Sequence, residues 1–389
     1  MLSVQPLQIQ DRPELVAAWL KDFLNAELIR QGQRHIDLYS RDLSGKLADW
    51  GIDSLLSTSL ASSLYLALDC EASGVLNRVW PDRDWQSWLH FSTAAMAAPP
   101  REMQFMSSGS VGAQHPHRHL FAWLVREMQD IAEHFGQIER IVTMVPAHHI
   151  YGFLFTVILP ALLGVPRIDA RALPAPALAQ HGRAGDLWIT HPFWLQSFLQ
   201  CGLAIPAGAT LISSTQRLPD EWMRQIARRG GRIVEMYGSS ETAGVAWRQQ
   251  PDAFQLLKRW SKHADGTLVD GYSDLRQVDV PDQVEWLDER HFRVIGRVDR
   301  IVKIAGERVD LDAVEAHILR FPGVTSARVR QTTALVPRLK ALLVPASLAE
   351  HLEDLRAHVS GLGAPARPQT WSFRDALPCS DMGKEIDWE

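Results

Sequence analysis

The chain has 389 residues, enough for about two or three packed domains, and its 46% hydrophobic and 22% charged residues are typical of a globular protein. The formal net charge of −5 gives no overall attraction to nucleic acid or to an anionic membrane surface, so a polyanion-binding function is disfavoured. The three cysteines form no CxxC pair, which argues against a disulfide framework or a zinc site. A cytoplasmic location without a membrane span is expected, because neither a signal peptide nor a sufficiently long apolar run is recognisable.

The first part of the chain, residues 1–93, is predicted to be a separate helical unit. Apolar residues recur at helical spacing over residues 13–30 and 54–68, and a short Trp-containing amphipathic stretch covers residues 84–91. The small-residue stretch 94–100 ends in two prolines and is typical of a linker.

Strand-like runs then alternate with helical stretches over residues 104–296, an alternation that predicts an α/β sheet. A small α+β domain is predicted over residues 297–389. The expected fold class is therefore α/β, with a helical N-terminal unit, a larger α/β domain and a small α+β C-terminal domain. The predicted strands are 141–146, 187–190, 210–213, 232–236, 301–304, 327–330 and 340–344.

A serine- and glycine-rich segment, Ser107 to Gly112, is a candidate phosphate-binding loop ahead of a predicted helix at residues 119–132. Its two glycines permit a tight turn whose backbone N–H groups point at phosphate oxygens, and its serine hydroxyls add donors. Most serine- and glycine-rich turns bind no phosphate, so this motif supports a phosphate site only in combination with the motifs that follow it in the chain.

Three alternating histidines, His115, His117 and His119, follow this segment. A metal site is one interpretation, and a polar loop that enters a helix is the other. The second is favoured, because helical geometry would splay the three rings and no cysteine or carboxylate completes a site.

Two further motifs come directly after predicted strands. Residues 146–152 contain an imidazole and a phenol, and residues 237–241 read Tyr-Gly-Ser-Ser-Glu. Because ligands of open α/β sheets bind outside the carboxyl ends of the strands, both motifs are expected at one edge. There Tyr237 can stack on a nucleotide base and Glu241 can hold Mg²⁺, although His149 taken singly is equally well a structural histidine.

The C-terminal part contains two more motifs. Residues 296–306 form a charge-rich turn followed by a short strand and a glycine, for which a solvated linker is the simple alternative. Residues 377–384 form a loop bounded by proline and glycine that carries Lys384, and most lysines in such loops are merely exposed.

In this order, the motifs resemble those of the superfamily that contains acyl- and aryl-CoA ligases, nonribosomal-peptide adenylation domains and luciferases, over roughly residues 104–386. The resemblance implies an enzyme that activates a carboxylic acid with ATP as its acyl-adenylate. It also implies that the larger α/β domain binds the nucleotide, that the small C-terminal domain is a mobile lid with its hinge at Asp299, and that Glu241 binds Mg²⁺. The implied catalytic residues are Lys384, Glu241, Ser240 and His149. The implied ATP-binding residues are Ser107, Ser108, Gly109, Ser110, Gly112, Tyr237, Gly238, Asp282 and Arg297.

Within this superfamily the chain is most similar to the compact ligases of aryl-polyene and xanthomonadin pigment pathways. The resemblance implies an aromatic, hydroxybenzoate-like substrate and transfer of the acyl group to the thiol of CoA or of the phosphopantetheine of an acyl carrier protein. There are two departures from the family pattern, Val111 in place of threonine and His115 in place of lysine. Part of the expected binding of pyrophosphate is therefore either missing or supplied by His115, His117 or Arg118. The implied acid-pocket residues are His149, Ile150, Tyr151, Ser213 and Ser214.

The helical N-terminal part contains the sequence Trp50 to Leu55, which resembles the phosphopantetheine site of acyl carrier proteins, with Ser54 as the modified serine. The simpler and favoured interpretation is that Asp53 or Ser54 caps the next helix. Two alternatives to a thiol ligase remain. One is a carrier or docking module with Ser54 on a non-catalytic nucleotide-binding scaffold, and the other is an adenylating enzyme with an amine or oxygen acceptor.

Overall fold

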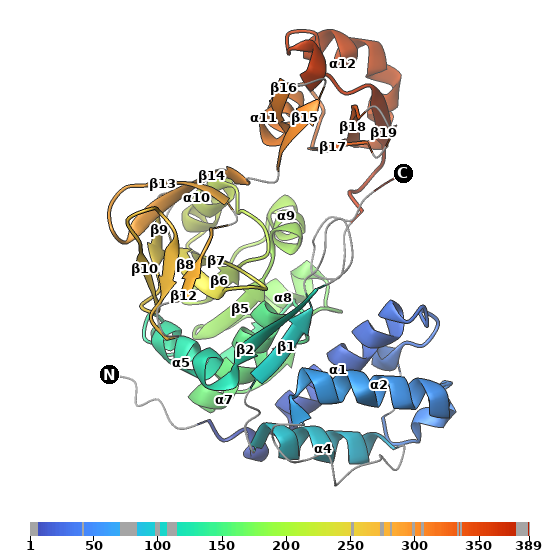
Figure 1. Ribbon diagram of the computed structural model, residues 1–389, viewed down its shortest axis with the longest axis vertical. Helices are drawn as coiled ribbons and strands as arrows, with labels where there is room; N and C mark the ends of the chain where they lie inside the picture. The colour runs from blue at the N-terminus through green and yellow to red at the C-terminus, as the bar shows by residue number, and fades with distance from the viewer. Residues whose placement is uncertain are drawn as a thin grey trace. The chain divides into compact units, whose positions relative to one another are not determined.

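A computed structural model describes thirteen parts of the chain (Figure 1). The candidate phosphate loop Ser107 to Gly112, the predicted hinge Asp299 and the predicted catalytic Lys384 lie outside the described residues. The described parts are residues 7–40, 43–70, 84–97, 102–106, 115–249, 253–272, 276–280, 282–297, 300–304, 307–332, 334, 337–378 and 388.

The N-terminal helices match the prediction closely. Helix α1 begins with Pro13, which needs no hydrogen bond for its nitrogen, and buries apolar residues such as Trp19. Helix α2 begins after Asp53, whose Oδ1 accepts a hydrogen bond from the Leu56 N–H at 2.9 Å, so the expected helix cap is confirmed. The described elements here are η1 (Ile9–Asp11), α1 (Pro13–Arg30), η2 (Leu38–Ser40), η3 (Leu47–Trp50), α2 (Ser54–Ala67) and α4 (Trp85–Ala97).

The central sheet of this part of the chain has the strand order β9-β8-β7-β6-β5-β3-β4. Strands β7, β6, β5, β3 and β4 are parallel, whereas β8 pairs antiparallel with both β7 and β9. The strands are β3 (Arg140–Thr143), β4 (Arg167–Asp169), β5 (Asp186–Thr190), β6 (Thr210–Ser213), β7 (Arg232–Ser239), β8 (Ala243–Arg248) and β9 (Phe254–Leu256).

Helices cover both faces of this sheet. On one face Trp188 and Leu211 share an apolar cluster with Phe198 and with residues of the two neighbouring helices. On the other face Ile131 lines a small cavity together with Val234. Alternate residues of each strand thus meet different helices, as the two-residue period of a buried strand requires. The helices are α5 (Phe121–Ala132), α8 (Ala175–His181), α9 (Pro192–Gln200) and α10 (Asp220–Arg228).

The segment after the candidate phosphate loop corrects one prediction. Residues 116–120 form strand β2 (Pro116–Leu120), which pairs antiparallel with β1 (Glu102–Met106), and helix α5 begins only at Phe121. The helix predicted to start at residue 119 therefore starts two residues later. Because the segment is a strand, His117 and His119 lie on the same side of it and do not splay.

Within the described residues, the second part of the chain contains small sheets and the two α-helices α11 and α12. Residues from both helices and from β17 and β18 form one apolar cluster that includes Val314, Val329, Leu343 and Leu355. The predicted α+β character is therefore present here. The elements are β13 (Asp282–Trp286), β14 (His291–Arg297), β15 (Ile301–Ile304), β16 (Glu307–Asp310), α11 (Leu311–Ile318), β17 (Ser326–Gln331), β18 (Leu339–Val344), η7 (Ala346–His351), α12 (Leu352–Val359), η8 (Ala364–Ala366) and β19 (Thr370–Phe373); β10 (Trp260–Lys262), β11 (Leu268–Asp270) and β12 (Arg276–Val278) precede them.

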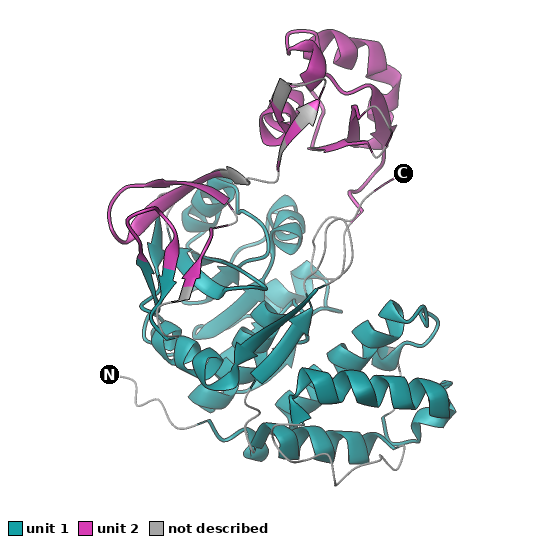
Figure 2. Ribbon diagram, viewed as in Figure 1, with its two compact units in different colours: residues 1–261, 269–276, 381–384 teal, residues 262–268, 277–380, 385–389 magenta. Residues whose placement is uncertain are grey.

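By its internal contacts the chain divides into two compact units (Figure 2). The first contains the described residues up to 261 and from 269 to 276, and the second contains residues 262–268 and most of the chain beyond 277. This division differs from the three domains expected from the sequence, because the N-terminal helices and the sheet belong to one unit. The bounds of a three-domain organisation stay a prediction.

Buried polar contacts explain why the N-terminal helices join the sheet. Asp22 of α1 is 1% exposed, accepts a hydrogen bond from the Ala147 N–H at 2.5 Å and lies 3.0 Å from the Arg171 guanidinium. Arg12 donates to the carbonyl oxygens of Pro160 and Val165. Among the helices that the structure describes, none combines the length and the apolar character required to cross a bilayer.

Candidate active site

The parallel strands β3, β5, β6 and β7 end at a common edge, and most of the described site residues follow them. Residues 144–149 turn from β3 into a helical segment of residues 150–163, which consists of α6 (Ile150–Phe153), the π-helical turn η5 (Leu154–Ile158) and α7 (Leu159–Leu163). Gly152 is required in this turn, because a Cβ there would lie 1.9 Å from the Pro146 carbonyl oxygen. The turn fixes His149 as the residue that precedes α6.

Two of the expected acid-pocket residues are largely buried, since Ile150 and Tyr151 are each 8% exposed. The Tyr151 hydroxyl donates to the backbone carbonyls of Thr190, at 3.0 Å, and Ile212, at 3.2 Å. Burial raises the pKa of Tyr151 well above its usual value. The hydroxyl therefore ties α6 to the ends of β5 and β6, and only the ring is left to shape a pocket.

The two serines expected in the acid pocket differ in their bonding. Ser214 donates from Oγ to the Met236 carbonyl at 3.0 Å, which joins the end of β6 to β7. Ser213 is fully buried, and its Oγ has no hydrogen-bond partner within the described part of the chain. Of the two serines, Ser213 is thus the one whose hydroxyl is not already used in a hydrogen bond within the described part of the chain.

The Tyr-Gly-Ser-Ser-Glu motif covers the end of β7 and the start of the turn between β7 and β8. The pairing of the two strands shifts register between Tyr237 and Gly238, and a Cβ at Gly238 would lie 2.1 Å from the Ala243 carbonyl. Such bulges re-aim side chains at the ends of strands. The turn leaves the Glu241 carboxylate 53% exposed, and Ser239 and Thr242 hydrogen-bond to each other inside it.

Strand β2 lies against this turn. His119 donates from Nε2 to the Ser240 carbonyl at 2.7 Å, and His117 Nε2 lies 3.3 Å from Glu241 Oε1. The hairpin that flanks the candidate phosphate loop is therefore joined to the motif that carries Glu241. The alternation of the three histidines at the two-residue period of a strand was the sequence signal for this contact, whereas the predicted helix from residue 119 would not have produced it.

The expected ribose-binding pair also comes together. Strands β13 and β14 form a hairpin in which the backbones of Asp282 and Arg297 stand directly opposite each other. Fifteen residues apart in the sequence, the two are neighbours across a strand pair, which brings them to one place within the second unit.

His191 is a further residue at the strand ends that the sequence analysis did not single out. It follows β5, is 6% exposed, and accepts a hydrogen bond at Nδ1 from the Trp194 N–H at 3.3 Å, which leaves the ring proton on Nε2. Its position before the proline of helix α9 was the available sequence signal, since helix caps accept such bonds.

The oxygen atoms of the turn suit Mg²⁺, which prefers one or two carboxylates and otherwise keeps its own waters. Glu241 supplies an exposed carboxylate, and the same turn contains the Ser239 hydroxyl, which accepts a hydrogen bond from the Glu241 N–H, and the Thr242 hydroxyl. Across the described ranges, no three side chains of histidine, cysteine, aspartate or glutamate gather into a denser metal cluster. A site completed by substrate phosphates fits this arrangement.

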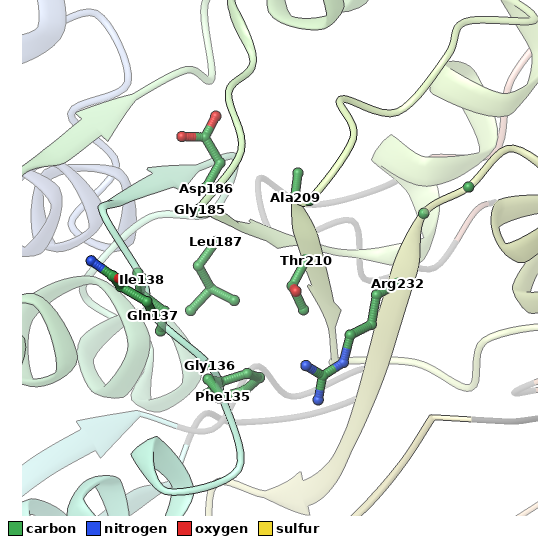
Figure 3. A pocket seen from close by; sticks show the side chains of 13 residues that line it. Phe135, Gly136, Gln137, Ile138, Gly185, Asp186, Leu187, Ala209, Thr210 and Arg232 are labelled. Atoms are coloured by element: carbon green, nitrogen blue, oxygen red, sulfur yellow. The ribbon is translucent and has the colours of Figure 1, made fainter. Parts of the chain in front are cut away.

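A cavity of about 290 Å³ lies at the opposite end of the sheet (Figure 3). Residues around the amino ends of β5, β6 and β7 line it, among them Asp186, Thr210 and Arg232. The carboxylate of Asp186 is already held by Arg140 and by the Arg183 N–H. This cavity is therefore separate from the residues gathered at the carboxyl ends of the strands.

Solved structures share this fold. The chain matches the O-succinylbenzoate coenzyme A synthetase of Bacillus subtilis in complex with AMP with a TM-score of 0.57 and 16% identity, over 73% of this chain and 67% of that one. It matches the ATP-bound MatB of Rhodopseudomonas palustris with a TM-score of 0.58 and 15% identity, over 72% and 66% of the two chains. The α/β fold expected from the sequence is thereby confirmed.

Relatives with higher sequence identity identify the protein family. No family model matches the chain. A 4-coumarate–CoA ligase of Rhodobacter capsulatus is 34% identical over 353 residues, which cover 87% of this chain and 90% of the relative. A 4-coumarate–CoA ligase of Halorhodospira halophila is 32% identical over 342 residues, 85% of this chain and 87% of that relative. The chain belongs to the adenylate-forming acid–CoA ligase family.

Proposed function

We propose that this protein activates an aromatic carboxylic acid with ATP and then transfers the acyl group to a thiol. The observation that carries the proposal is the contact of His117 and His119 with Glu241 and Ser240, which joins the strand after the candidate phosphate loop to the candidate magnesium ligand. Relatives named 4-coumarate–CoA ligase support the class of reaction and an aromatic acid.

In the first half-reaction a carboxylate oxygen of the acid attacks the α-phosphorus of ATP and pyrophosphate leaves. Positioning and charge neutralisation are the main tasks of the protein in such a transfer. Mg²⁺ held by Glu241 would supply positive charge against the leaving pyrophosphate. The assigned roles are contact of Lys384 with the carboxylate and α-phosphate, stacking of Tyr237 on the base, and binding of the ribose by Asp282 and Arg297.

The acid would bind at the ends of β3 and β6, and we assign His149, Ile150 and Tyr151 to the pocket that holds it; Ile150 and Tyr151 are each 8% exposed. The spare Ser213 hydroxyl is suited to a ring hydroxyl of the substrate, because a buried donor without a partner selects a ligand that supplies one. We therefore assign a hydroxybenzoate-like acid, as in the pigment-pathway ligases that the sequence resembles.

In the second half-reaction a thiol sulfur attacks the acyl carbon of the adenylate and AMP leaves. The acceptor is assigned as CoA or the phosphopantetheine of an acyl carrier protein. A rotation of the C-terminal domain about Asp299 would clear the space that Lys384 occupies during adenylation.

The test is Mg²⁺-dependent ATP–pyrophosphate exchange with benzoic, hydroxybenzoic, cinnamic and fatty acids, followed by thioester formation with CoA and with a phosphopantetheinylated carrier protein. We expect exchange with a hydroxylated aromatic acid and thioester with one of the two thiols. Exchange with fatty acids alone would contradict the substrate assignment. The absence of exchange with every acid would contradict adenylation. Hydroxamate formation without thioester would favour an amine or oxygen acceptor.

The carrier alternative rests on one surface observation. Ser54 is exposed at the start of α2, and the Leu55 side chain next to it is 80% exposed. A mass increase of roughly 340 Da on Ser54 after incubation with CoA and a phosphopantetheinyl transferase would support this modification. An unchanged mass would leave the capping of α2 by Asp53 as the only role assigned to this segment.

A further inference from the structure

Three buried charged side chains lie beneath the turn that carries Glu241. Glu127 of α5 is 1% exposed, Arg259 is 5% exposed and Asp270 is 2% exposed. The Arg259 guanidinium donates two hydrogen bonds to Asp270, at 2.8 and 2.6 Å, and one to Glu127 Oε2, at 3.2 Å. We call these residues the Glu127–Arg259–Asp270 triad.

The triad is bonded directly to the backbone of the turn. The Gly244 N–H donates to Glu127 Oε1 at 2.9 Å, and Arg259 Nη1 lies 3.5 Å from the Thr242 carbonyl oxygen. The neighbouring Trp260 donates from Nε1 to the Gly244 carbonyl at 2.7 Å. Both polar groups of the Gly244 backbone are thus held by buried side chains three residues beyond Glu241.

The turn requires such support because its backbone conformation is unfavourable. Ala243 has a φ of +58°, in the left-handed region that costs energy for any residue with a Cβ. A Cβ on Gly244 would lie 2.7 Å from Glu127 Oε1, so the backbone approaches the carboxylate as closely as only glycine allows. A strained turn persists only where surrounding contacts determine it.

Helix α5 also connects the triad to the strand that contacts the turn from its other side. It begins directly after β2, whose His119 donates to the Ser240 carbonyl. One continuous segment of chain therefore holds the turn at Ser240 through β2 and at Gly244 through Glu127. Glu241 lies between these two points.

We propose that Glu127, supported by Arg259 and Asp270, is a positioning residue that fixes the turn so that the Glu241 carboxylate is oriented for Mg²⁺. This inference rests on the proposed function for the role of Glu241. That the triad fixes the turn is inferred from its hydrogen bonds alone and does not depend on the proposed function.

The sheet offers a matched control in Glu235 of β7. Its side chain is 2% exposed, pairs with Arg248 Nε at 2.7 Å and accepts a hydrogen bond from the Leu218 N–H at 2.7 Å. Glu235 and Glu127 thus share burial, an arginine partner and a backbone N–H, but no hydrogen bond of Glu235 reaches residues 239–244 within the described structure.

The test compares Glu127→Gln with Glu235→Gln in the full chain by two measurements. The first is hydrogen–deuterium exchange of the backbone amides in residues 239–244, followed by mass spectrometry. The second is the Mg²⁺ concentration that gives half-maximal ATP–pyrophosphate exchange. For Glu127→Gln we expect amide exchange in this peptide roughly tenfold faster and a several-fold higher Mg²⁺ requirement, with the KM for the acid unchanged. For Glu235→Gln we expect neither change.

Unchanged amide exchange in Glu127→Gln, or an equal acceleration in both variants, would overturn the proposal. Faster exchange with an unaltered Mg²⁺ requirement would remove the link to Glu241. If the unmodified enzyme shows no pyrophosphate exchange, adenylation fails as the function, whereas amide exchange still decides whether the triad fixes the turn. If Glu127→Gln is recovered unfolded, Asp270→Asn takes its place, because it weakens the hold on Arg259 and keeps the bond to Gly244.

Discussion

The carboxyl group of Glu127 is held where water does not reach it. Desolvation raises its pKa to about 7, and Arg259 and the Gly244 N–H oppose this shift only in part. The group therefore binds a proton more tightly in the folded protein than in the unfolded chain, whose reference pKa is 4.5. The contribution of Glu127 to stability is fully present below pH 4.5 and is lost as the pH rises through 7.

We therefore expect the free energy of unfolding of the unmodified protein to fall relative to that of Glu127→Gln between pH 5 and pH 8. The size of the change is on the order of 2 kcal/mol, from a shift of this size and about 1.4 kcal/mol per pKa unit. Urea denaturation of both proteins at the two pH values measures it, with Glu235→Gln as a second reference. A difference that stays constant from pH 5 to pH 8 would contradict the shifted pKa.

Among the elements, those with a clear hydrophobic period could be predicted from the sequence. Helix α1 has the predicted bounds 13–30, and strand β6 has the predicted bounds 210–213. In each of these two elements, the spacing of the apolar residues fits one type of secondary structure only. Strands such as β8 and β9 were not predicted, because they pair in an antiparallel sheet whose order depends on residues far away in the chain.

The site was predictable to a similar degree. The motifs containing His149 and Tyr237 follow strands whose carboxyl ends share an edge, as the alternation of elements indicated. The bond of the Tyr151 hydroxyl to two strand ends, and the triad beneath Glu241, were not predictable. Each depends on side chains that meet only after folding, such as Glu127 and Arg259, and a lone buried carboxylate has no sequence signature.

Helix α1 provides the prediction at the scale of an element. Replacement of Asp22 by alanine leaves the buried Ala147 N–H without its acceptor and removes one of the two carboxylates that pair with Arg171, the other being Asp169, so we expect a loss of about 1–3 kcal/mol. The control is Glu14→Ala on the same helix, whose exposed pair with Arg12 is worth less than about 1 kcal/mol. Thermal and urea unfolding measure both variants, and equal losses would mean that the buried contact adds nothing.

The whole molecule consists of two compact units, and the proposed reaction consists of two half-reactions. Lys384 is assigned to adenylation alone. We therefore expect Lys384→Ala to lower the rate of adenylation roughly 100-fold or more, while thioester formation from a supplied acyl-adenylate continues. The control is Lys258→Ala, because the exposed Lys258 side chain pairs only with surface carboxylates. Equal loss of both half-reactions in Lys384→Ala would contradict the assignment.

The bond between Asp22 and Ala147 also sets a waiting time during synthesis. The two residues are 125 positions apart, so at about 5–20 residues per second the acceptor is made roughly 6–25 s before its donor. During that interval the Asp22 carboxylate stays hydrated, and the apolar side of α1 cannot yet pack against the sheet. Synonymous codon changes that slow translation between these positions would lengthen the period in which α1 is exposed, without altering any contact in the folded protein.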